Sequence, residues 1–259
     1  MGLLDTVGTD LVNHCVNDIA VMGALPMFFL DYIGHSDLEP EGIAEIISGF
    51  SNACQANCLA LIGGETAQMP GIYPPGHFDL VGFIVGKATS AGLLTGEKIA
   101  DGDVIVGFPS TGLHTNGYSL ARKVFEGDCL NDEYSGKSLG QLLLEPHRSY
   151  LTEVKWLMEN IELHGMAHIT GGGIAGNLIR VLPEGLDAYV EKATAPRPLI
   201  FDLIAESGVA EDEMYRVFNM GFGYLAIVEK ESVQSVLERF DDAYVAGRIE
   251  KGEHTVHVI

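Results

Sequence analysis

The sequence predicts a layered fold of the α+β or α/β class, built as two domains. Helical and strand patterns alternate along the whole chain, which is typical of such layered architectures. With 259 residues, 47% of them hydrophobic, the chain can bury a substantial core and is long enough for one large domain or two ordinary ones. Because a turn-rich connector interrupts the pattern near residue 92, we expect an N-terminal domain over residues 1–92 and a C-terminal domain over residues 93–259.

The N-terminal part shows two helical patterns and three strand patterns. Apolar side chains recur at helical spacing over residues 10–23, and Gly23 with Pro26 ends that helix. A second helix fits residues 40–56. The segments MFFLDYI, CLALI and FDLVGFIVGKAT predict strands, and GGETAQMPGIYPPG, between the last two, predicts a loop.

The part beyond the connector SAGLLTGEKIADGD alternates strands and helices more regularly. The expected strands are DVIVGFP, MAHI, DAYVEK, GYLAIVE, YVAGRI and HTVHVI. The expected helices are NGYSLARKVF, RSYLTEVKWLMEN, IAGNLIRVLP, LIFDLIAESG, DEMYRVFN and SVQSVLERF.

The charge balance restricts the class of partner. Fifteen Lys and Arg face 36 Asp and Glu, a formal net charge of -21, which argues against nucleic acid or an anionic membrane as the main partner. An anionic substrate would need backbone N–H groups, a few well-placed cations or a divalent metal ion. No secretory signal or membrane span is visible, and the four cysteines suit a reducing compartment, so we expect a cytoplasmic protein.

One carboxylate and one glycine pair indicate a metal–phosphate site. Asp18 lies in an otherwise apolar helix, where a charge needs a partner. Glu65 follows Gly63 and Gly64, and such a loop can expose N–H groups to an anion while the carboxylate holds Mg2+. A plain Gly-Gly turn is the simpler alternative.

Two further segments combine small or glycine residues with a following helix. In STGLHTNGYSLARK, His114 could reach into a pocket beside a helix N-terminus, or Asn116 or Ser119 could merely cap that helix. In HITGGGIAGNLIR, three consecutive glycines precede a helix, and close approach to a phosphate or base would explain them. No Walker A or dinucleotide motif occurs, so these residues indicate Mg2+ and phosphate without naming a reaction.

Six segments together carry a family resemblance. They resemble, in the same order along the chain, segments of the aminoimidazole ribonucleotide synthetases, also called phosphoribosylformylglycinamidine cyclo-ligases. The six segments are CVNDIAVMGALPMFFLDY, GGETAQMPGIY, DLVGFIVG, STGLHTNGYSLARK, HITGGGIAGNLIRVLP and EMYRVFNMGFGYLAIV. The resemblance implies ATP-driven closure of the imidazole ring of formylglycinamidine ribonucleotide, with release of ADP and phosphate, in purine biosynthesis. It also implies a two-domain fold and a homodimer that joins the first domains through their sheets.

The resemblance further implies roles for particular residues. Asp18 and Glu65 would bind the Mg2+ of ATP, and Asp18 and His114 would be catalytic. The other implied nucleotide- and substrate-binding residues are Asn17, Gly63, Gly64, Thr66, Ser110, Asn116, Gly117, Thr170, Gly171, Gly172, Gly173, Asn177 and Arg180.

One departure concerns the start of the chain. Family members begin with a glycine-rich, lysine-containing loop and an Asp-Gly-Val-Gly-Thr-Lys motif, whereas DTVGTD at residues 5–10 lacks the lysine and matches a later stretch. We therefore expect an incomplete N-terminal domain, through a truncated gene or fragment, a misassigned start, or a partner chain that supplies the rest. The alternatives to a cyclo-ligase are a related kinase or selenophosphate synthetase, and a non-catalytic remnant that binds nucleotide or a partner.

Overall fold

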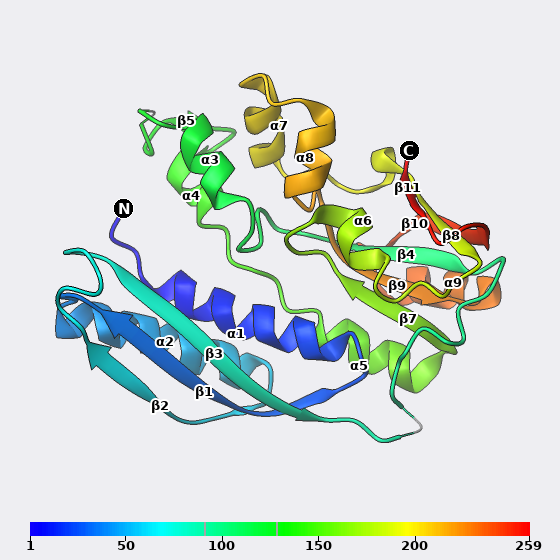
Figure 1. Cartoon of the computed structure of the whole chain (residues 1–259), viewed down its shortest axis with the longest axis horizontal. Helices are drawn as coiled ribbons and strands as arrows, with labels where there is room; N and C mark the ends of the chain where they lie inside the picture. Colours follow the sequence, from blue (N-terminus) through cyan, green and yellow to red (C-terminus); the bar gives the residue numbers. More distant parts are fainter. Residues whose placement is uncertain (91, 128) are drawn as a thin grey trace.

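The computed structural model describes residues 1–90, 92–127 and 129–259, and confirms a two-part α/β fold (Figure 1). The first sheet has the strand order β2-β1-β3, with β1 parallel to β2 and antiparallel to β3. The second has the order β11-β8-β10-β4-β9-β7 and is antiparallel except for the β11–β8 pair. Ala91, inside the expected connector, lies outside the described residues, and the boundary at residue 92 stays a prediction.

The elements have the following bounds. The first sheet contains β1 (Leu25–His35), β2 (Ala60–Gln68) and β3 (Phe78–Lys87). The second contains β4 (Val104–Pro109), β7 (Leu163–His168), β8 (Leu186–Val190), β9 (Phe222–Val228), β10 (Tyr244–Lys251) and β11 (Val256–Val258). A small hairpin pairs β5 (Glu133–Tyr134) with β6 (Lys137–Ser138).

The helices of the first part are α1 (Asp5–Ala20) and α2 (Pro40–Ala56). Those of the second part are α3 (Tyr118–Val124), α4 (Leu139–Leu143), α5 (Leu151–Asn160), α6 (Gly173–Leu178), α7 (Leu199–Glu206), α8 (Glu211–Val217) and α9 (Val233–Arg239). Single 3-10 turns occupy Lys192–Thr194 and Lys230–Ser232. The first helix begins and ends earlier than residues 10–23, and the one after the three glycines ends at Leu178 rather than near Pro183.

The core of the first part lies between its sheet and its two helices. Val16 of α1, Ile46 and Phe50 of α2, and Phe29 and Ile33 of β1 are fully buried in one cluster. The opposite face of the sheet carries large apolar side chains that remain exposed. They are Met27, Ile62, Val81, Phe83 and Val85.

The expected loop over residues 63–76 is wrong at its start, because β2 continues to Gln68. Its backbone pairs in parallel with β1, with a register shift where Leu61 and Gly63 oppose successive β1 residues. A Cβ on Gly64 would meet the Asp31 carboxylate at 2.3 Å, so the neighbouring strand explains this glycine. Non-local strand pairing therefore overrides the local turn signal of Gly-Gly.

The strand β9 of the second sheet is buried on both faces. Alternate residues of β9 point to opposite sides, so that Ile227 joins a cluster with α6, α7 and α8, while Ala226 and Val228 join one with α5 and α9. All of β9 is buried. A central antiparallel strand covered on both faces explains the unbroken apolar run FGYLAIV.

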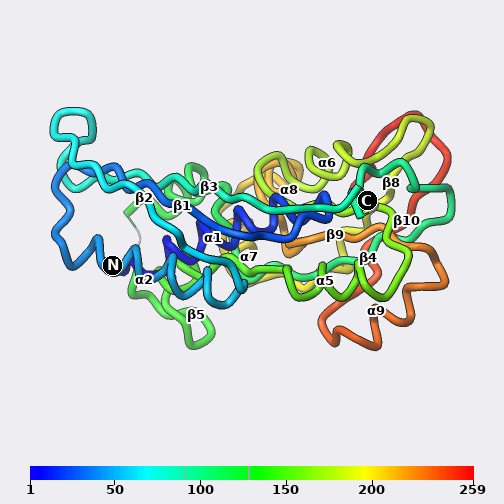
Figure 2. Tube along the Cα trace, turned by 90° about the horizontal axis from the view of Figure 1, so that it is seen from below, coloured from blue at the N-terminus to red at the C-terminus, as the bar shows by residue number. Residues whose placement is uncertain are grey.

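Helix α1 belongs to both parts of the molecule. Its apolar side packs on α2 and the first sheet, and it also contacts α5 of the second part. Figure 2 shows its trace extending from the side of α2 toward β9. The side chains of Asn13 and Asn17 donate to the backbone oxygens of His147 and Arg148, at 2.7 and 2.8 Å. Among the described residues, no helix is both long and apolar enough to cross a membrane.

The crossing of α1 and α2 depends on glycine. A Cβ on Gly49 would lie 2.1 Å from the backbone oxygen of Asp5. One on Gly42 of the same helix would meet only flexible side-chain ends, those of Leu4 at 3.0 Å and Leu38 at 4.0 Å. We predict that Gly49→Ala lowers the free energy of unfolding by about 1–3 kcal/mol, because the two helix backbones must separate. Urea denaturation followed by circular dichroism measures this.

The control is Gly42→Ala, for which we expect no loss, since alanine favours a helix over glycine by about 1 kcal/mol. Equal stability of the Gly49→Ala protein and the wild type would contradict the close-contact explanation.

Candidate active site

A cavity of about 500 Å³ opens where the end of α1 meets the second sheet. Asp18 comes from α1, His168 from the end of β7, and Thr170, Asn177 and Arg180 from the segment that contains α6. The apolar part of its wall is formed by Val21, Met22, Leu94, Met166, Ala167 and Val181. Four of the sequence-predicted residues thus lie around one cavity: Asp18, Thr170, Asn177 and Arg180.

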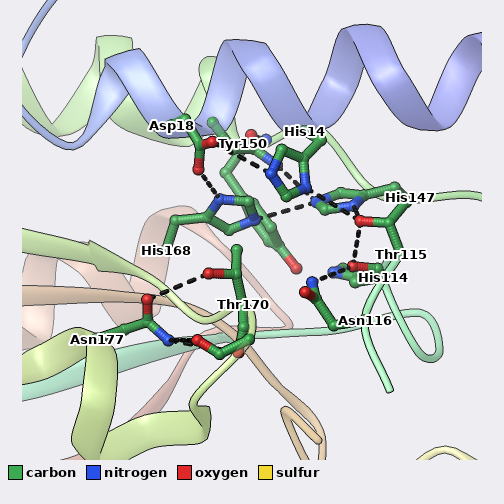
Figure 3. A network of polar contacts seen from close by, with 12 residues as sticks. His14, Asp18, His114, Thr115, Asn116, His147, Tyr150, His168, Thr170 and Asn177 are labelled. Atoms are coloured by element: carbon green, nitrogen blue, oxygen red, sulfur yellow. Dashed lines mark hydrogen bonds and ion pairs between the residues drawn. The ribbon is translucent and has the colours of Figure 1, made fainter. Parts of the chain in front are cut away.

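Asp18 is held by two imidazoles from opposite parts of the molecule (Figure 3). His168 Nδ1 donates to its Oδ1 at 2.8 Å, and His14 Nε2, one turn earlier on α1, donates to its Oδ2 at 3.1 Å. The carboxylate nevertheless remains 51% exposed, so it can contact a ligand in the cavity. Burial raises the pKa of Asp18, but the hydrogen bonds from His14 and His168 outweigh it and hold the pKa well below its usual range. Asp18 is therefore an anion at every physiological pH.

Two more histidines extend this network. His147 Nε2 lies 3.0 Å from His168 Nε2, and the His147 ring stacks on that of His114 at a centroid distance of 4.3 Å. Burial lowers the pKa of His147 and of His168, and it lowers that of His114 to about 3. These rings are consequently neutral at pH 7, and His168 orients the anionic Asp18 without cancelling its charge.

The α6 segment is rigidified by its own hydrogen bonds. Asn177 Nδ2 donates to the Gly173 backbone oxygen at 2.8 Å, and Thr170 Oγ1 donates to Asn177 Oδ1 at 3.1 Å. A Cβ on Gly173 would lie 2.1 Å from the backbone oxygen of Tyr215, so packing against α8 requires this glycine. Arg180 is exposed at the cavity and has no carboxylate partner among the described residues.

Other predicted residues support the cavity without lining it. Asn17 is fully buried, and its Oδ1 accepts from the Tyr150 backbone N–H at 2.9 Å. His114 is 1% exposed, its Nε2 accepts from the Thr111 N–H at 3.0 Å, and its Nδ1 has no partner among the described residues. Through these contacts both side chains hold neighbouring backbone segments in place.

The segment that precedes α3 lies beside the glycines of the α6 segment. A Cβ on Gly171 would lie 3.2 Å from Asn116 Oδ1, and the Asn116 amide donates to the His114 backbone oxygen. The residue that caps α3 is Gly117, in a left-handed conformation with φ 77°, so the expected cap by Asn116 or Ser119 is wrong. Ser110 Oγ donates to Asn219 Oδ1 at 2.7 Å. A Cβ on Gly172 would make only an ordinary contact, with Gly176 Cα at 3.8 Å, and its φ of 95° is what favours glycine there.

Four predicted residues do not line the cavity, because they lie on β2 at the exposed edge of the first sheet. They are Gly63, Gly64, Glu65 and Thr66. The residues missed by sequence reasoning are His14, His147 and His168. The spacing of four residues between His14 and Asp18 on one helix is a signal for the first of them. His147 lies in a loop, where no local pattern indicates its place.

A second cavity, of about 430 Å³, lies farther along α1. Asp10, His14, Thr115 and Tyr118 supply its polar groups, and its apolar wall consists of Val7, Leu11, Leu80 and Leu144. Asp10 Oδ1 accepts from the His147 backbone N–H at 2.8 Å. Burial raises the pKa of Asp10 to about 6, although this hydrogen bond and His14 oppose the rise.

Comparison with known proteins identifies the family. Residues 4–88 match the model described as AIR synthase related protein, N-terminal domain, and residues 100–259 match its C-terminal domain. A phosphoribosylformylglycinamidine cyclo-ligase of Anaeromyxobacter sp. (strain Fw109-5) is 48% identical over 98% of this chain and 77% of its own length. The chain belongs to the phosphoribosylformylglycinamidine cyclo-ligase family.

Solved structures with lower identity share the fold of this cyclo-ligase family member. Thiamine monophosphate kinase from Aquifex aeolicus matches with a TM-score of 0.70 at 21% identity, over 99% of this chain and 81% of that one. Hydrogenase maturation protein HypE in complex with ATP matches with a TM-score of 0.70 at 16% identity, over 95% and 71% of the two chains. The family resemblance predicted from the sequence is confirmed.

The raised pKa of Asp10 has a consequence for stability. Because the folded protein holds this proton more tightly than the unfolded chain between pH 3.8 and about 6, stability falls as the pH rises through that range and stays lower above it. We predict that Asp10→Asn raises the free energy of unfolding at pH 7.5 by about 1–3 kcal/mol and leaves it unchanged below pH 4. Urea denaturation at both pH values measures the difference.

Asp5→Asn, an exposed position on the same helix, is the control and should show no such gain. An Asp10→Asn protein no more stable than the wild type at pH 7.5 would refute the cost of burying this carboxylate.

Proposed function

We propose that this chain catalyses the ATP-dependent ring closure of formylglycinamidine ribonucleotide to 5-aminoimidazole ribonucleotide, with release of ADP and phosphate. Family membership supports the reaction. The structural observation that carries the proposal is the single cavity shared by Asp18, His168, Thr170, Asn177 and Arg180. An anionic carboxylate and an unpaired arginine at one cavity suit a metal–nucleotide complex, which carries both kinds of charge.

Asp18 fits the role of a Mg2+ ligand. The described residues contain no cluster of three or more His, Cys, Asp or Glu side chains arranged for a metal ion, so the protein alone does not form a closed metal cage. A single exposed carboxylate suits Mg2+, which is commonly held by one or two carboxylates together with substrate phosphates. Bound there, Mg2+ would supply charge neutralisation for the transferring phosphoryl group. A role for Glu65 stays a prediction, because its carboxylate is exposed on the edge strand β2.

The remaining polar groups of the cavity would bind the phosphates of the nucleotide or orient the Asp18 carboxylate. Arg180 would contact phosphate oxygens, since its guanidinium has no competing carboxylate among the described residues. His168 and His14 fix the Asp18 oxygens through the 2.8 and 3.1 Å hydrogen bonds. The apolar side chains of Val21, Met22 and Leu94 would cover one side of a bound nucleotide and reduce its contact with water.

The proposal predicts ADP release that depends on both substrate and Asp18. With Mg-ATP and formylglycinamidine ribonucleotide, we expect the wild type to release ADP and Asp18→Asn to be slower by about 100-fold or more, because the charge opposite the metal ion is lost. A coupled ADP assay measures the rate. Saturating Mg-ATP should raise the melting temperature of the wild type more than that of the variant.

Asp5→Asn is again the matched control and should behave as the wild type. If Asp18→Asn and the wild type released ADP at equal rates, Asp18 would not be part of the active site. Ligand binding without any turnover of the wild type would instead favour a non-catalytic nucleotide-binding protein.

We also propose that two copies of the chain pair through the outer face of the first sheet. Phe83 is 62% exposed and Ile62 is 58% exposed on that face, beside Met27, Val81 and Val85. Contiguous apolar surface of this kind is rare on monomers and typical of protein interfaces. A face that meets its own copy about a two-fold axis would bury the same side chains on both subunits.

The dimer proposal predicts that Phe83→Lys shifts the protein to a monomer at micromolar concentration, because a charge then lies in the centre of the interface. Sedimentation velocity measures the state. The control is Val245→Lys, an apolar strand residue of the second sheet with 43% exposure, which should remain dimeric. A wild type that sediments as a monomer at all concentrations would end this proposal.

Two further expectations stay proposals. The net charge of -21 supports a small-molecule partner rather than nucleic acid or an anionic membrane. The four cysteines are all free thiols, which supports a reducing compartment such as the cytoplasm.

A further inference from the structure

Asp10, His14 and Asp18 follow one another at intervals of four residues along α1, so they occupy one face of the helix. Each interval corresponds to a rise of about 6 Å. Asp18 lines the first cavity and His14 and Asp10 line the second, while the His14–Asp18 hydrogen bond lies between the two. One end of a ligand bound in the second cavity would therefore lie close to His14 and Asp18, where the nucleotide is proposed to bind.

The second cavity offers one carboxylate, that of Asp10, in a mostly apolar wall that also contains the His14 ring. Four aliphatic side chains and the ring of Tyr118 form most of its wall, and the Tyr118 hydroxyl already donates to the Leu143 backbone oxygen at 2.6 Å. Thr115 Oγ1 likewise donates to the His114 backbone oxygen. Asp10 is therefore the main hydrogen-bond acceptor that remains available to a ligand in this cavity.

Asp10 has no lysine or arginine partner among the described residues. Within the described residues, its one hydrogen bond comes from the backbone N–H of His147. A partly buried carboxylate without a cation is costly, and a bound cationic donor would remove that cost. Since a carboxylate oxygen accepts more than one hydrogen bond, Asp10 retains capacity toward the cavity.

We propose that the second cavity binds the amidine end of the substrate and that Asp10 recognises its two N–H donors. This inference rests on the proposed function. An amidinium group is planar and cationic, and it presents two parallel N–H donors to a carboxylate in the way that a guanidinium does. The aliphatic wall suits the short uncharged chain that joins the amidine to the formyl group. The formyl oxygen would then point along α1 toward Asp18, where the phosphates of ATP are proposed to bind.

The amide analogue of the substrate separates this recognition from general binding. In formylglycinamide ribonucleotide, a carbonyl oxygen replaces the amidine nitrogen, so the ligand keeps its shape but loses the positive charge and one donor. The variant Asp10→Asn keeps a side-chain oxygen for the His147 N–H and removes only the charge. Because this variant is expected to be more stable than the wild type at neutral pH, weaker binding by it would not reflect unfolding.

The experiment is isothermal titration calorimetry of both ribonucleotides against the wild type, Asp10→Asn and Asp5→Asn at pH 7.5. We expect the wild type to bind the amidine about 10- to 100-fold more tightly than the amide, as a charge-assisted pair requires. Asp10→Asn should lose this preference entirely through weaker amidine binding, with its amide affinity unchanged. Asp5→Asn should retain the preference of the wild type.

The two proposals fail in different ways. A wild type that releases ADP with the amidine substrate, together with an Asp10→Asn protein that keeps the full amidine preference, would overturn the role of Asp10 and leave the cyclo-ligase reaction intact. A wild type that neither binds nor turns over the amidine would overturn both. Equal losses of amidine and amide affinity in Asp10→Asn would show a purely structural role and would also overturn the inference.

Discussion

The hydrogen bond between Asp18 and His168 is the contact on which the arrangement of the site depends. It joins residues 150 positions apart, one on the first helix and one at the end of a strand in the second sheet. Asn13, Asn17 and Asp10 attach the same helix to the segment around His147. Helix α1 thus packs on its own sheet through apolar side chains, and it contacts the second part through these polar groups as well as through Ala20. Polar contacts of defined geometry fix an orientation more closely than apolar packing does, because an unpaired buried partner is costly.

Several glycines in this structure are required by close packing rather than by the turns or ligand contacts that the local sequence suggests. Gly49 permits two helices to cross closely, Gly64 makes room for the Asp31 side chain, and Gly173 permits α6 to approach α8. All three are explained by neighbouring protein atoms. Binding of anions at the site would consequently depend mainly on Arg180 and on the metal ion that Asp18 is proposed to bind.

Local periodicity predicted much of the fold. The helix over residues 40–56 was predicted to its observed ends, and the strand patterns beyond residue 100 correspond to observed strands, because buried faces leave a regular apolar pattern. The segment from Gly63 to Gln68 was predicted wrongly as a loop, since its strand exists through parallel pairing with β1 and not through its own composition. The position of Asp18 could be inferred from its apolar neighbours. That of His147 could not, because its partners come from distant parts of the chain.

The four-residue spacing on α1 also limits how this protein can vary. A helix advances about 1.5 Å and turns about 100° with each residue, so one inserted or deleted residue between Asp10 and Asp18 would turn one carboxylate to another side of the helix. The surface turn between β5 and β6 meets no such requirement, because it lines neither of the two cavities along α1. Length changes among relatives should therefore concentrate in such turns, while this stretch of α1 keeps a constant number of residues.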